Sequence, residues 1–430
     1  MIGPLSLIVM LLIIFLGGGL WVGFSLLAIG IISLETFKNI KVDRFLAGDI
    51  WGTATAIELV TLPLFILMGE ILYRTRLSEN LFSGLSPFVR RLPGRLLHVN
   101  ILGCTLFAAV SGSSAATTAT VGRITINEMR SRGYADKLIL GSLAGAGTIG
   151  FLIPPSIPLI IYGVLAEVSI LDLFIAGIIP GLVLAFLFMF YIGALAIIQP
   201  AMTPAAEPST SMLEKAHALS KLLPTVLLIT FVVSSMYLGF ASVTEAAAIG
   251  VLGAVILAVL ERQFNISIMW SALQGTINTC AMIGLIITGA LFLSKAMARL
   301  RIPSDVANFI DSLGLQPFTL IILLMCFYIA LGCFLDGLST IVMTLPVTLP
   351  LVVTAGFDPI WFGIFLIITI EMAQITPPIG FNLFVIKSLS GNSIANIAFA
   401  ALPFCTIMVV LVLLLIFIPE LATWLPQSAL

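Results

Sequence analysis

Two long apolar segments of the chain are each interrupted by a pair of consecutive prolines. One pair is Pro154-Pro155 and the other is Pro377-Pro378. Proline lacks a backbone N–H and fits poorly inside a helix, so each pair should break its segment and free carbonyl groups of the preceding turn. In a bilayer such carbonyls need a partner, because non-helical backbone is tolerated only where it is buried in protein or lines a cavity. The chain must therefore fold so that it encloses both breaks.

The sequence around the two breaks is repeated with an offset of 225 positions, the separation of Gly112 and Gly337. Small and hydroxyl residues precede the first break from Ser111 to Thr120, and Asp336-Gly337-Leu338-Ser339-Thr340 precedes the second. Gly133 and Gly356 lie the same number of positions before the first proline of their pair. Paired, interrupted hydrophobic segments in two halves are the best sequence indication of a secondary transporter's binding site. We therefore predict two structural repeats.

Composition indicates a polytopic membrane protein. Hydrophobic residues make up 60% of the chain and charged residues 9%, whereas soluble domains average about 25% charged residues. The formal net charge is −1, and no basic tract suggests binding to nucleic acid. The two histidines, His98 and His217, lie in predicted loops, which disfavours histidine-based catalysis or metal binding. The five cysteines have no ligand spacing, so small buried hydrophobic side chains are favoured over metal ligands or disulfides.

The predicted fold is all-α, with about ten transmembrane helices and two re-entrant helical hairpins. Two apolar stretches, 97–127 and 315–352, carry small and polar residues at their centres, so a hairpin tip in a cavity is favoured over a straight helix in lipid. The other apolar segments are each near the ~20 residues that cross a bilayer. They are 4–17, 19–34, 54–73, 138–163, 172–198, 222–240, 243–260, 270–297, 358–386 and 398–420.

Charge places the two hairpins on opposite faces of the membrane. Arginine-rich segments, 74–98 and 123–137, flank the first hairpin, so it should enter from the cytoplasm. Counting spans places the second hairpin on the other face, which makes the repeats inverted. The polar stretch 199–221 is the expected cytoplasmic linker. The first repeat, 1–198, then comprises scaffold helices in 4–73, the hairpin 97–127 and the broken helix 138–163; the second, 222–430, comprises scaffold helices in 222–297, the hairpin 315–352 and the broken helix 358–386.

Several charged residues stand out against the apolar background. Asp336 lies at the predicted second tip, and an acid at such depth is a functional-site hypothesis by default. It could coordinate sodium, cap the second half-helix, or pair with Arg299. Arg299 could hold a substrate carboxylate in a bidentate pair, or it could be a positioning charge at the interface. For Glu371, inside a predicted span, an interfacial position or a packed polar pair is favoured over a proton relay.

The hydroxyl-rich first tip, 111–120, suits a hard cation such as sodium, because hydroxyls and freed backbone carbonyls supply oxygen ligands. Half-helix N-termini at the tip would favour an anionic substrate. Close packing of helices through small residues is the alternative interpretation of the same stretch.

These residues resemble the large membrane (permease, DctM-like) subunit of tripartite ATP-independent periplasmic (TRAP) transporters. The resemblance covers nearly the whole chain and is carried by Ser111–Gly122, Gly147–Gly163, Leu331–Pro350 and Glu371–Ile386. It implies a sodium-driven elevator in the bacterial inner membrane that imports an organic acid, such as a C4-dicarboxylate or sialic acid. It implies no enzyme activity and no cofactor beyond the coupling sodium ions. Its implied partners are a small four-helix membrane subunit, here a separate polypeptide, and a periplasmic substrate-binding protein.

The resemblance also implies sodium sites where each hairpin tip meets the opposing Pro-Pro break. Ser156 and Arg299 are the residues expected to contact substrate. The residues expected at the sodium sites are Ser111, Ser113, Gly147, Gly150 and Pro154 in the first half, and Gly332, Asp336, Gly337, Thr369 and Thr376 in the second.

Three other function classes are compatible with a polytopic chain. A stand-alone sodium-coupled carboxylate transporter would need no partner proteins. An intramembrane enzyme would need a catalytic pair, but Asp336 has no second aspartate in a matching span. A channel fits less well, because discontinuous helices with a closed tip suit an occluding transporter.

Overall fold

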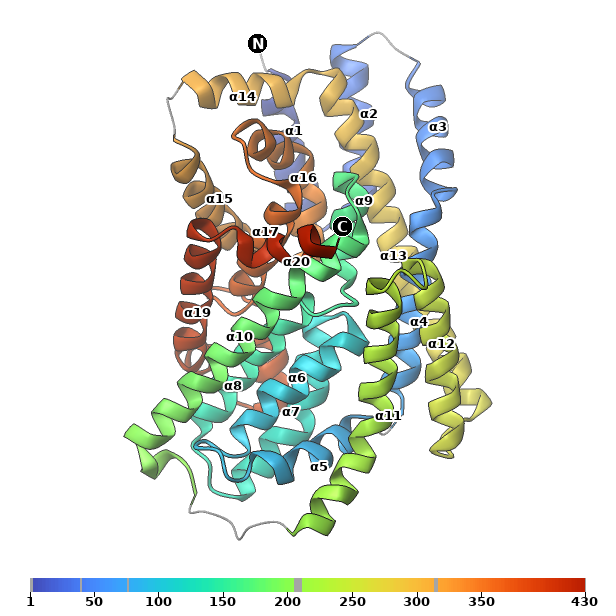
Figure 1. Cartoon of the computed structure of the whole chain (residues 1–430). Coiled ribbons are helices and arrows are strands. Elements are labelled where there is room, and N and C mark those ends of the chain that lie inside the picture. Colours follow the sequence, from blue (N-terminus) through green and yellow to red (C-terminus); the bar gives the residue numbers. More distant parts are fainter. Residues whose placement is uncertain (1–2, 39–40, 76, 205–210, 313–315, 430) are drawn as a thin grey trace.

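The structure, a computed structural model, describes residues 3–38, 41–75, 77–204, 211–312 and 316–429. These residues form helices, with no β-strand among them (Figure 1). In the first half the α-helices are α1 (Pro4–Gly17), α2 (Val22–Phe37), α3 (Val42–Ala54), α4 (Thr61–Tyr73), α5 (Leu77–Val89), α6 (Leu97–Ser111), α7 (Ser114–Ser131), α8 (Asp136–Thr148), α9 (Ile157–Ala166) and α10 (Ile170–Ile198). In the second half they are α11 (Met212–Tyr237), α12 (Val243–Leu260), α13 (Ile266–Arg299), α14 (Ile302–Ser312), α15 (Pro317–Gly332), α16 (Gly337–Thr354), α17 (Pro359–Gln374), α18 (Phe381–Ser390), α19 (Ile394–Phe417) and α20 (Glu420–Ala429). Short 3₁₀ turns occur at η1 (Ile57–Val60), η2 (Ile149–Phe151) and η3 (Pro200–Met202).

The number of long apolar helices is lower than the ten spans expected from the sequence. Within the described residues, six helices can cross a membrane by length and composition, namely α10, α11, α12, α13, α16 and α19. The bent pair of α3 and the segment 58–73 makes a seventh if counted as one span. The count falls because α1 and α2 have only 14 and 16 residues and because both Pro-Pro segments are split into shorter helices.

Two helix–turn–helix units form where the hairpins were expected. The first pairs α6 with α7, and the second pairs α15 with α16. They lie toward opposite ends of the molecule, with α6 and α7 low and α15 and α16 high in Figure 1. Their limits, 97–131 and 317–354, agree closely with the prediction, although residue 315 of the predicted second hairpin lies outside the described residues.

A peripheral bundle made of α2, α3, α4, α11, α12 and α13 flanks the two hairpins. Helix α13 packs along α2, α3 and α4, while α12 packs on α4 and α11 packs on α12. This bundle occupies the right-hand side of Figure 1. Helix α17 lies in the other part of the molecule, where every residue from Trp361 to Gln374 is buried. Groups on α17 therefore face protein and not lipid.

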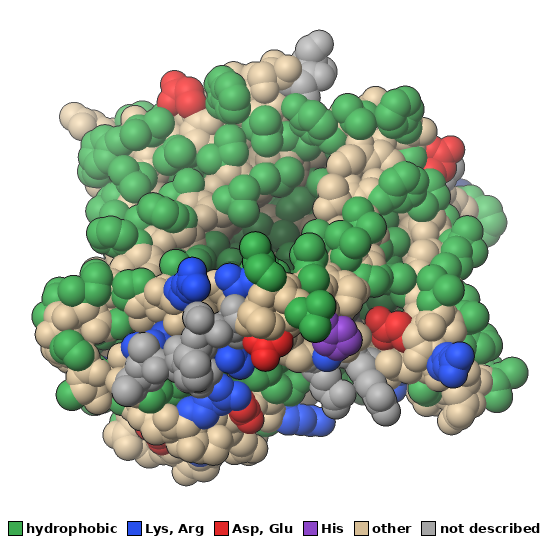
Figure 2. Space-filling view, turned by 60° about the horizontal axis from the view of Figure 1, so that its bottom comes forward, with side chains coloured by type: hydrophobic (Ala, Val, Ile, Leu, Met, Phe, Trp, Pro, Cys, Tyr) green, Lys and Arg blue, Asp and Glu red, His purple; other side chains and the backbone are tan. Residues whose placement is uncertain are grey.

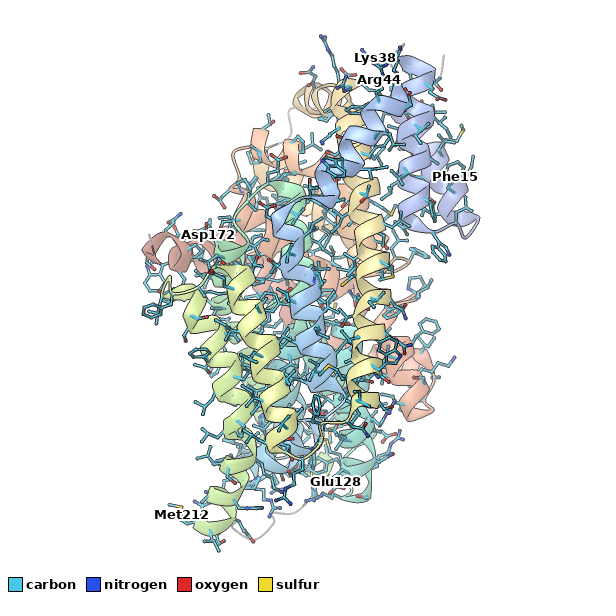
Figure 3. The ribbon with its side chains drawn as sticks, turned by 90° about the vertical axis from the view of Figure 1, so that its right-hand side faces the viewer. Phe15, Lys38, Arg44, Glu128, Asp172 and Met212 are labelled. Carbon is cyan, nitrogen blue, oxygen red and sulfur yellow. The ribbon has the colours of Figure 1, made fainter. Side chains whose placement is uncertain are left out.

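The ends of the molecule agree with the expected sidedness of the loops. Figure 3 places Glu128 and Met212 at one end and Lys38 and Arg44 at the opposite end. Segment 123–137 and the end of the linker thus share a face, and Lys38 and Arg44 lie on the other.

Several segments differ from the expected boundaries. Residues 212–221 of the expected linker extend α11, because Ser211 and Glu214 form a reciprocal capping box at its start. Residues 205–210 of that linker lie outside the described residues. Helix α3 forms between the expected spans 19–34 and 54–73, and α3, α5, α14 and α20 were not expected as helices.

Candidate functional site

The tip of the first hairpin is a tight turn at Gly112. This residue has φ +57°, a left-handed conformation that ends α6 and favours glycine. Ser113 then caps α7, where its side chain accepts the backbone N–H of Ala116 at 3.4 Å. The hydroxyl of Ser111 lies 2.8 Å from that of Thr117. The hydroxyls of Ser111 and Ser113 therefore hold the turn together and are half-buried.

Ser114, the first residue of α7, connects this tip to three other helices. Its hydroxyl lies 3.0 Å from the carbonyl oxygen of Gly147 in α8 and 3.2 Å from Oε2 of Glu371 in α17. It also accepts a hydrogen bond from Nδ2 of Asn382 in α18 at 2.7 Å. Ser114, Glu371 and Asn382 are fully buried. One hydroxyl thus joins elements from both halves of the chain.

Two predicted glycines of the first break pack directly against the first hairpin. A Cβ added to Gly147 would lie 1.9 Å from Oγ1 of Thr118 in α7. A Cβ added to Gly150 would lie 3.4 Å from Cβ of Ala108 in α6. The break and the tip therefore meet as predicted, and Gly147 is the tightest point of contact between them.

The first break itself is formed by Pro154-Pro155, whose peptide bond is cis. Pro154 is buried. Ser156 follows and caps α9, since its hydroxyl accepts the backbone N–H of Leu159 at 3.4 Å and donates to the carbonyl oxygen of Phe151. Ser156 is fully buried. In this structure the Ser156 hydroxyl, which was expected to contact substrate, caps the start of α9.

The tip of the second hairpin is more open than the first. Asp336 is exposed, and its carboxylate caps α16 by accepting the backbone N–H of Ser339 at 3.2 Å. Phe334, in the same turn, is 63% exposed. Of the three roles expected for Asp336, the structure shows the helix cap.

Both predicted glycines of the second hairpin pack on α17. A Cβ added to Gly332 would lie 2.7 Å from Cβ of Ala373, and one added to Gly337 would lie 2.6 Å from Nε2 of Gln374. Gly337 also lies against Phe151 of the first break, at 2.8 Å from the same constructed Cβ. The second tip therefore contacts both breaks.

The second break is bonded to the second tip through Cys333. The backbone N–H of Gly380 donates to the Cys333 carbonyl at 3.2 Å, and the Cys333 thiol lies 3.4 Å from the carbonyl oxygen of Pro377. Thr376 and Thr369 donate their hydroxyls to carbonyls one turn earlier, at 2.7 and 2.8 Å. Thr369 is fully buried, and Thr376 is half-buried beside the break. Pro377 and Pro378 are themselves exposed, so the expectation that the chain encloses both breaks holds for the first break and is wrong for the second.

Arg299 lies in the peripheral bundle. Its guanidinium carbon is 4.2 Å from the centre of the Phe45 ring in α3, and the side chain is exposed. Such a stacked arrangement is favourable for a cation. The structure does not bring Arg299 together with Asp336, whose carboxylate caps α16.

The structure places the glycines of the second hairpin and of the first break in contact with neighbouring hairpin or break residues, leaves Arg299 in the peripheral bundle, and adds residues that the sequence did not indicate. Ser114 lies in the hydroxyl-rich run already noted, and Asn382 lies just after the second Pro-Pro pair. Their partnership spans 268 positions and that of Ser114 with Glu371 spans 257, so no local spacing could reveal either.

The donor atoms at the first site are of the kinds that bind hard cations. Ser114 offers a hydroxyl, Gly147 a backbone carbonyl and Glu371 a carboxylate, all within one hydrogen-bonded cluster. Oxygen ligands of these kinds suit hard cations, whereas nitrogen and sulfur ligands suit transition metals. The first site can therefore hold an ion such as sodium.

Comparison with known families identifies the chain's class. The family model described as the DctM component of the tripartite ATP-independent periplasmic transporter matches residues 8–421. The chain belongs to this family. The resemblance seen in the sequence is therefore confirmed. As a member of the DctM family, the chain is a multi-pass protein of the inner membrane, in agreement with its long apolar helices.

Relatives of this DctM-family chain are transporter permeases and not enzymes. The C4-dicarboxylate TRAP transporter large permease protein DctM of Pseudomonas aeruginosa is 32% identical over 387 residues, covering 89% of this chain and 90% of the relative. The sialic acid TRAP transporter large permease protein SiaM of Vibrio cholerae is 28% identical, covering 95% of each chain. Among solved structures, the YdaH transporter of Alcanivorax borkumensis matches with a TM-score of 0.64 at 14% identity, over 97% of this chain and 99% of that one. The last similarity concerns the fold alone.

Proposed function

We propose that this chain is the membrane permease of a sodium-coupled importer of an organic acid. The observation that carries the proposal is the convergence of two hairpin tips on two Pro-Pro breaks, in a chain of the DctM family. Interrupted helices at membrane depth create a site of hydroxyls and backbone carbonyls that can bind ions and substrate together. Ion and substrate must favour the same conformation, because coupling is a differential affinity between two states.

Sodium is the coupling ion that suits the available ligands best. At the first break, Ser114, Gly147 and Glu371 would hold it; at the second, Asp336 and Thr376 supply oxygens close to the tip and the break. A bound cation would satisfy both the carbonyls freed by proline and the nearby hydroxyls. Binding would tighten each tip against its break.

The transport movement in this proposal is an elevator built from two inverted repeats. Support comes from the placement of the two hairpins toward opposite ends of the molecule and from the peripheral bundle beside them, which could serve as the stationary scaffold. Seen from the end that carries Met212, the surface is hollowed between two lobes, and hydrophobic side chains surround the hollow (Figure 2). Such a hollow is where a moving unit could slide past a fixed one.

The proposed substrate is a carboxylate, and the proposed partners are a small four-helix membrane subunit and a periplasmic substrate-binding protein. The names of relatives specify C4-dicarboxylates, sialic acid and 2,3-diketo-L-gulonate. A permease protein of Oleidesulfovibrio alaskensis named DctMQ matches 98% of this chain over 66% of its own length. That extra length of the relative is compatible with a second subunit fused to its permease.

Reconstitution tests this proposal. The chain would be placed in vesicles with the candidate small subunit, and uptake of a panel of labelled organic acids measured with and without a sodium gradient and the binding protein. We expect uptake that requires both the sodium gradient and the binding protein. Uptake without the binding protein would favour a stand-alone transporter, and uptake that is independent of sodium would overturn the coupling.

A further inference from the structure

A network of polar groups centred on Arg130 lies far from the first site, near the C-terminal end of α7. The guanidinium donates from Nε and Nη2 to the two carboxylate oxygens of Asp136, the first residue of α8, at 2.8 and 2.7 Å. It also donates to Oδ1 of Asn392 at 2.9 Å and to the carbonyl oxygen of Ser390 at 3.0 Å. Asn392 in turn donates from Nδ2 to Asp136 at 3.3 Å. The side chains of Arg130, Asp136 and Asn392 therefore bond to one another in a closed ring, which we call the Arg130 network.

The Arg130 network joins the first half of the chain to the second. Ser390 and Asn392 are 260 and 262 positions away from Arg130. Ser390 is the last residue of α18, and Asn392 lies in the turn that leads to α19. Helix α18 packs on α7 and α8, and α19 packs on α8. Arg130 thus fixes the turn between α7 and α8 to the turn between α18 and α19.

The three helices that meet at the Arg130 network also meet at the first site, through their opposite ends. Ser114 is the first residue of α7, Gly147 lies at the far end of α8, and Asn382 lies in the first turn of α18. The Ser114 hydroxyl bonds to the Gly147 carbonyl oxygen at 3.0 Å and accepts the hydrogen bond of Asn382 at 2.7 Å. Helices α7, α8 and α18 are therefore connected by Ser114 at one end and by Arg130 at the other.

A connection at one end of these helices affects the other end. Arg130 follows Ser114 by about four turns of α7. An α-helix is stiff along its axis, because each turn is hydrogen-bonded to the next, so a shift of the helix at Arg130 also moves Ser114. The guanidinium is planar and presents its donors in a rigid fork, so it fixes the direction as well as the distance of its partners.

We propose that Arg130 is a positioning residue, which holds α7, α8 and α18 at the relative heights that bring Ser114, Gly147 and Asn382 together. It touches neither ion nor substrate. Its effect on transport rests on the proposed function, in which this site binds the coupling ion.

The change Arg130→Lys separates this role from that of the charge alone. A positive residue at this end of the molecule also suits the expected orientation in the membrane, and lysine keeps that charge. The lysine ammonium is a point charge without the planar fork, so it cannot bond to Asp136, Ser390 and Asn392 in the same geometry. The matched control is Arg132→Lys, because Arg132 bonds to Glu128 of its own helix.

Hydrogen exchange of backbone amides tests the proposal on the purified full chain without any assumption about transport. Exchange reports the free energy of local opening. In Arg130→Lys we expect faster exchange both beside the substitution, at 130–136, and at the distant first tip, 111–118. The tip should exchange about two- to fivefold faster, and fivefold is equivalent to about 1 kcal/mol. Faster exchange at 130–136 alone, or the same acceleration of the tip in Arg132→Lys, would overturn the proposal.

A second variant removes only the contribution of the second half of the chain. Asn392→Ala leaves the ion pair of Arg130 with Asp136 in place, and its position in a half-buried turn favours folding. It should also accelerate exchange at the tip. The matched control is Asn396→Ala, because Asn396 is exposed on α19. An unaltered tip in a folded Asn392→Ala protein would overturn the connection between the halves.

Uptake measurements then relate the position of the helices to transport. In vesicles, Arg130→Lys and Asn392→Ala should raise the half-saturating sodium concentration about two- to fivefold, while the two control variants leave it unchanged. A merely structural role would lower the amount of active protein, and so the maximal rate, without moving half-saturation. If wild-type uptake does not depend on sodium, the proposed coupling fails, and hydrogen exchange still decides the role of Arg130. Unchanged half-saturation in both variants, with sodium-dependent uptake by the wild type, would overturn the effect on transport.

Discussion

The two hairpin tips meet their breaks in different ways. The first tip is anchored in the interior, where Ser114 bonds to groups on α8, α17 and α18. The second tip carries an exposed Asp336 and an exposed Phe334, and its bonds to the second break run through Cys333. The second tip thus has less buried contact than the first.

The difference indicates that the two hairpin tips differ in how readily they open. Local opening costs least where few buried contacts must be broken. We therefore expect the second tip to open more readily than the first and to admit substrate, while the first tip stays fixed to the core. The predictions below test this contrast, from the largest expected effect to the smallest.

The largest effect is expected from Gly147→Ala at the first break. The new Cβ would lie 1.9 Å from Oγ1 of Thr118, a stiff, fully buried side chain. Overpacking of this kind costs typically about 1–3 kcal/mol, and it should also abolish uptake. At the second tip, the new Cβ of Gly337→Ala would lie 2.6 Å from Nε2 of Gln374 and 2.8 Å from Cε2 of Phe151, neither as close as the contact at Gly147, so its cost should be smaller. Thermal unfolding in detergent would compare the two variants.

A compensating change tests the cause of that effect. Gly147→Ala combined with Thr118→Ala removes the obstructing hydroxyl, so the double variant should regain much of the stability lost by Gly147→Ala. Gly284→Ala in α13 is a control, because its new Cβ would have no neighbour within 4 Å. Equal destabilisation by Gly147→Ala and Gly337→Ala would contradict the unequal packing of the two tips.

The turn of the first hairpin should be the more sensitive to backbone strain. Gly112 has φ +57°, while no residue of the second turn from Cys333 to Asp336 has a positive φ. Gly112→Ala should therefore cost roughly 1–2 kcal/mol through its backbone conformation, and Gly112→Asn less, because asparagine tolerates this conformation better. Both variants also place a Cβ 2.9 Å from Cγ1 of Ile157, so that contact is common to the two. Phe334→Ala in the second turn should have little effect on stability. Thermal unfolding in detergent tests this prediction. Equal stability losses for Gly112→Ala and Gly112→Asn would exclude backbone strain as the cause.

The sequence predicted the hairpins and the breaks well because local chemistry determines them. Gly112 ends one helix, Asp336 begins another, and each Pro-Pro pair interrupts its segment whatever surrounds it. For the same reason the hairpin limits were close to those observed. The family could also be identified, since the motifs that carry it are continuous stretches.

Other features depend on contacts between distant residues and could not be predicted from spacing. The bond of Ser114 to Glu371 joins positions 257 apart, and Arg299 is placed by its stacking on Phe45. Surface helices such as α5 and α14 were missed because they are too short and too polar to register as spans. The predicted number of spans exceeds the number of long apolar helices because the two short helices α1 and α2 and the two segments expected to be broken were all counted as spans.

Asp336 should matter less to ion binding than Glu371, because the first is exposed and the second is buried. Asp336→Asn retains an oxygen that can cap α16, so stability should change little, while Asp336→Ala should cost about 1 kcal/mol. If the carboxylate coordinates sodium at the second tip, Asp336→Asn will also weaken the sodium dependence of uptake. Sodium titration of uptake checks this, and an unchanged sodium response would restrict Asp336 to its capping role.

The smallest effect concerns the N-terminal ends of α8 and α17, two helices that occupy matching positions in the two halves. At α8, Arg130 bonds to Asp136 at 2.7 Å and also to Asn392, which follows α18. The bond from Arg130 holds the pKa of Asp136 below its ordinary value. At α17, Asp358 accepts the backbone N–H of Trp361 and takes part in no ion pair within the described residues. The start of α8 should therefore be the more sensitive to acid.

Because the folded-state pKa of Asp136 is depressed, the pair stabilises the protein above the unfolded pKa and loses its effect as pH falls through the folded one. The stability difference between wild type and Asp136→Asn should thus be constant near neutral pH and shrink only below about pH 4. It should be less than about 1 kcal/mol, since the pair is partly exposed. Adding Arg130→Gln to Asp136→Asn should cost only what Arg130 gains from its bonds to Asn392 and to the Ser390 carbonyl, because the ion pair is already lost. A difference that persists undiminished at low pH would show that Asp136 acts through packing or capping of α8 and not through its charge.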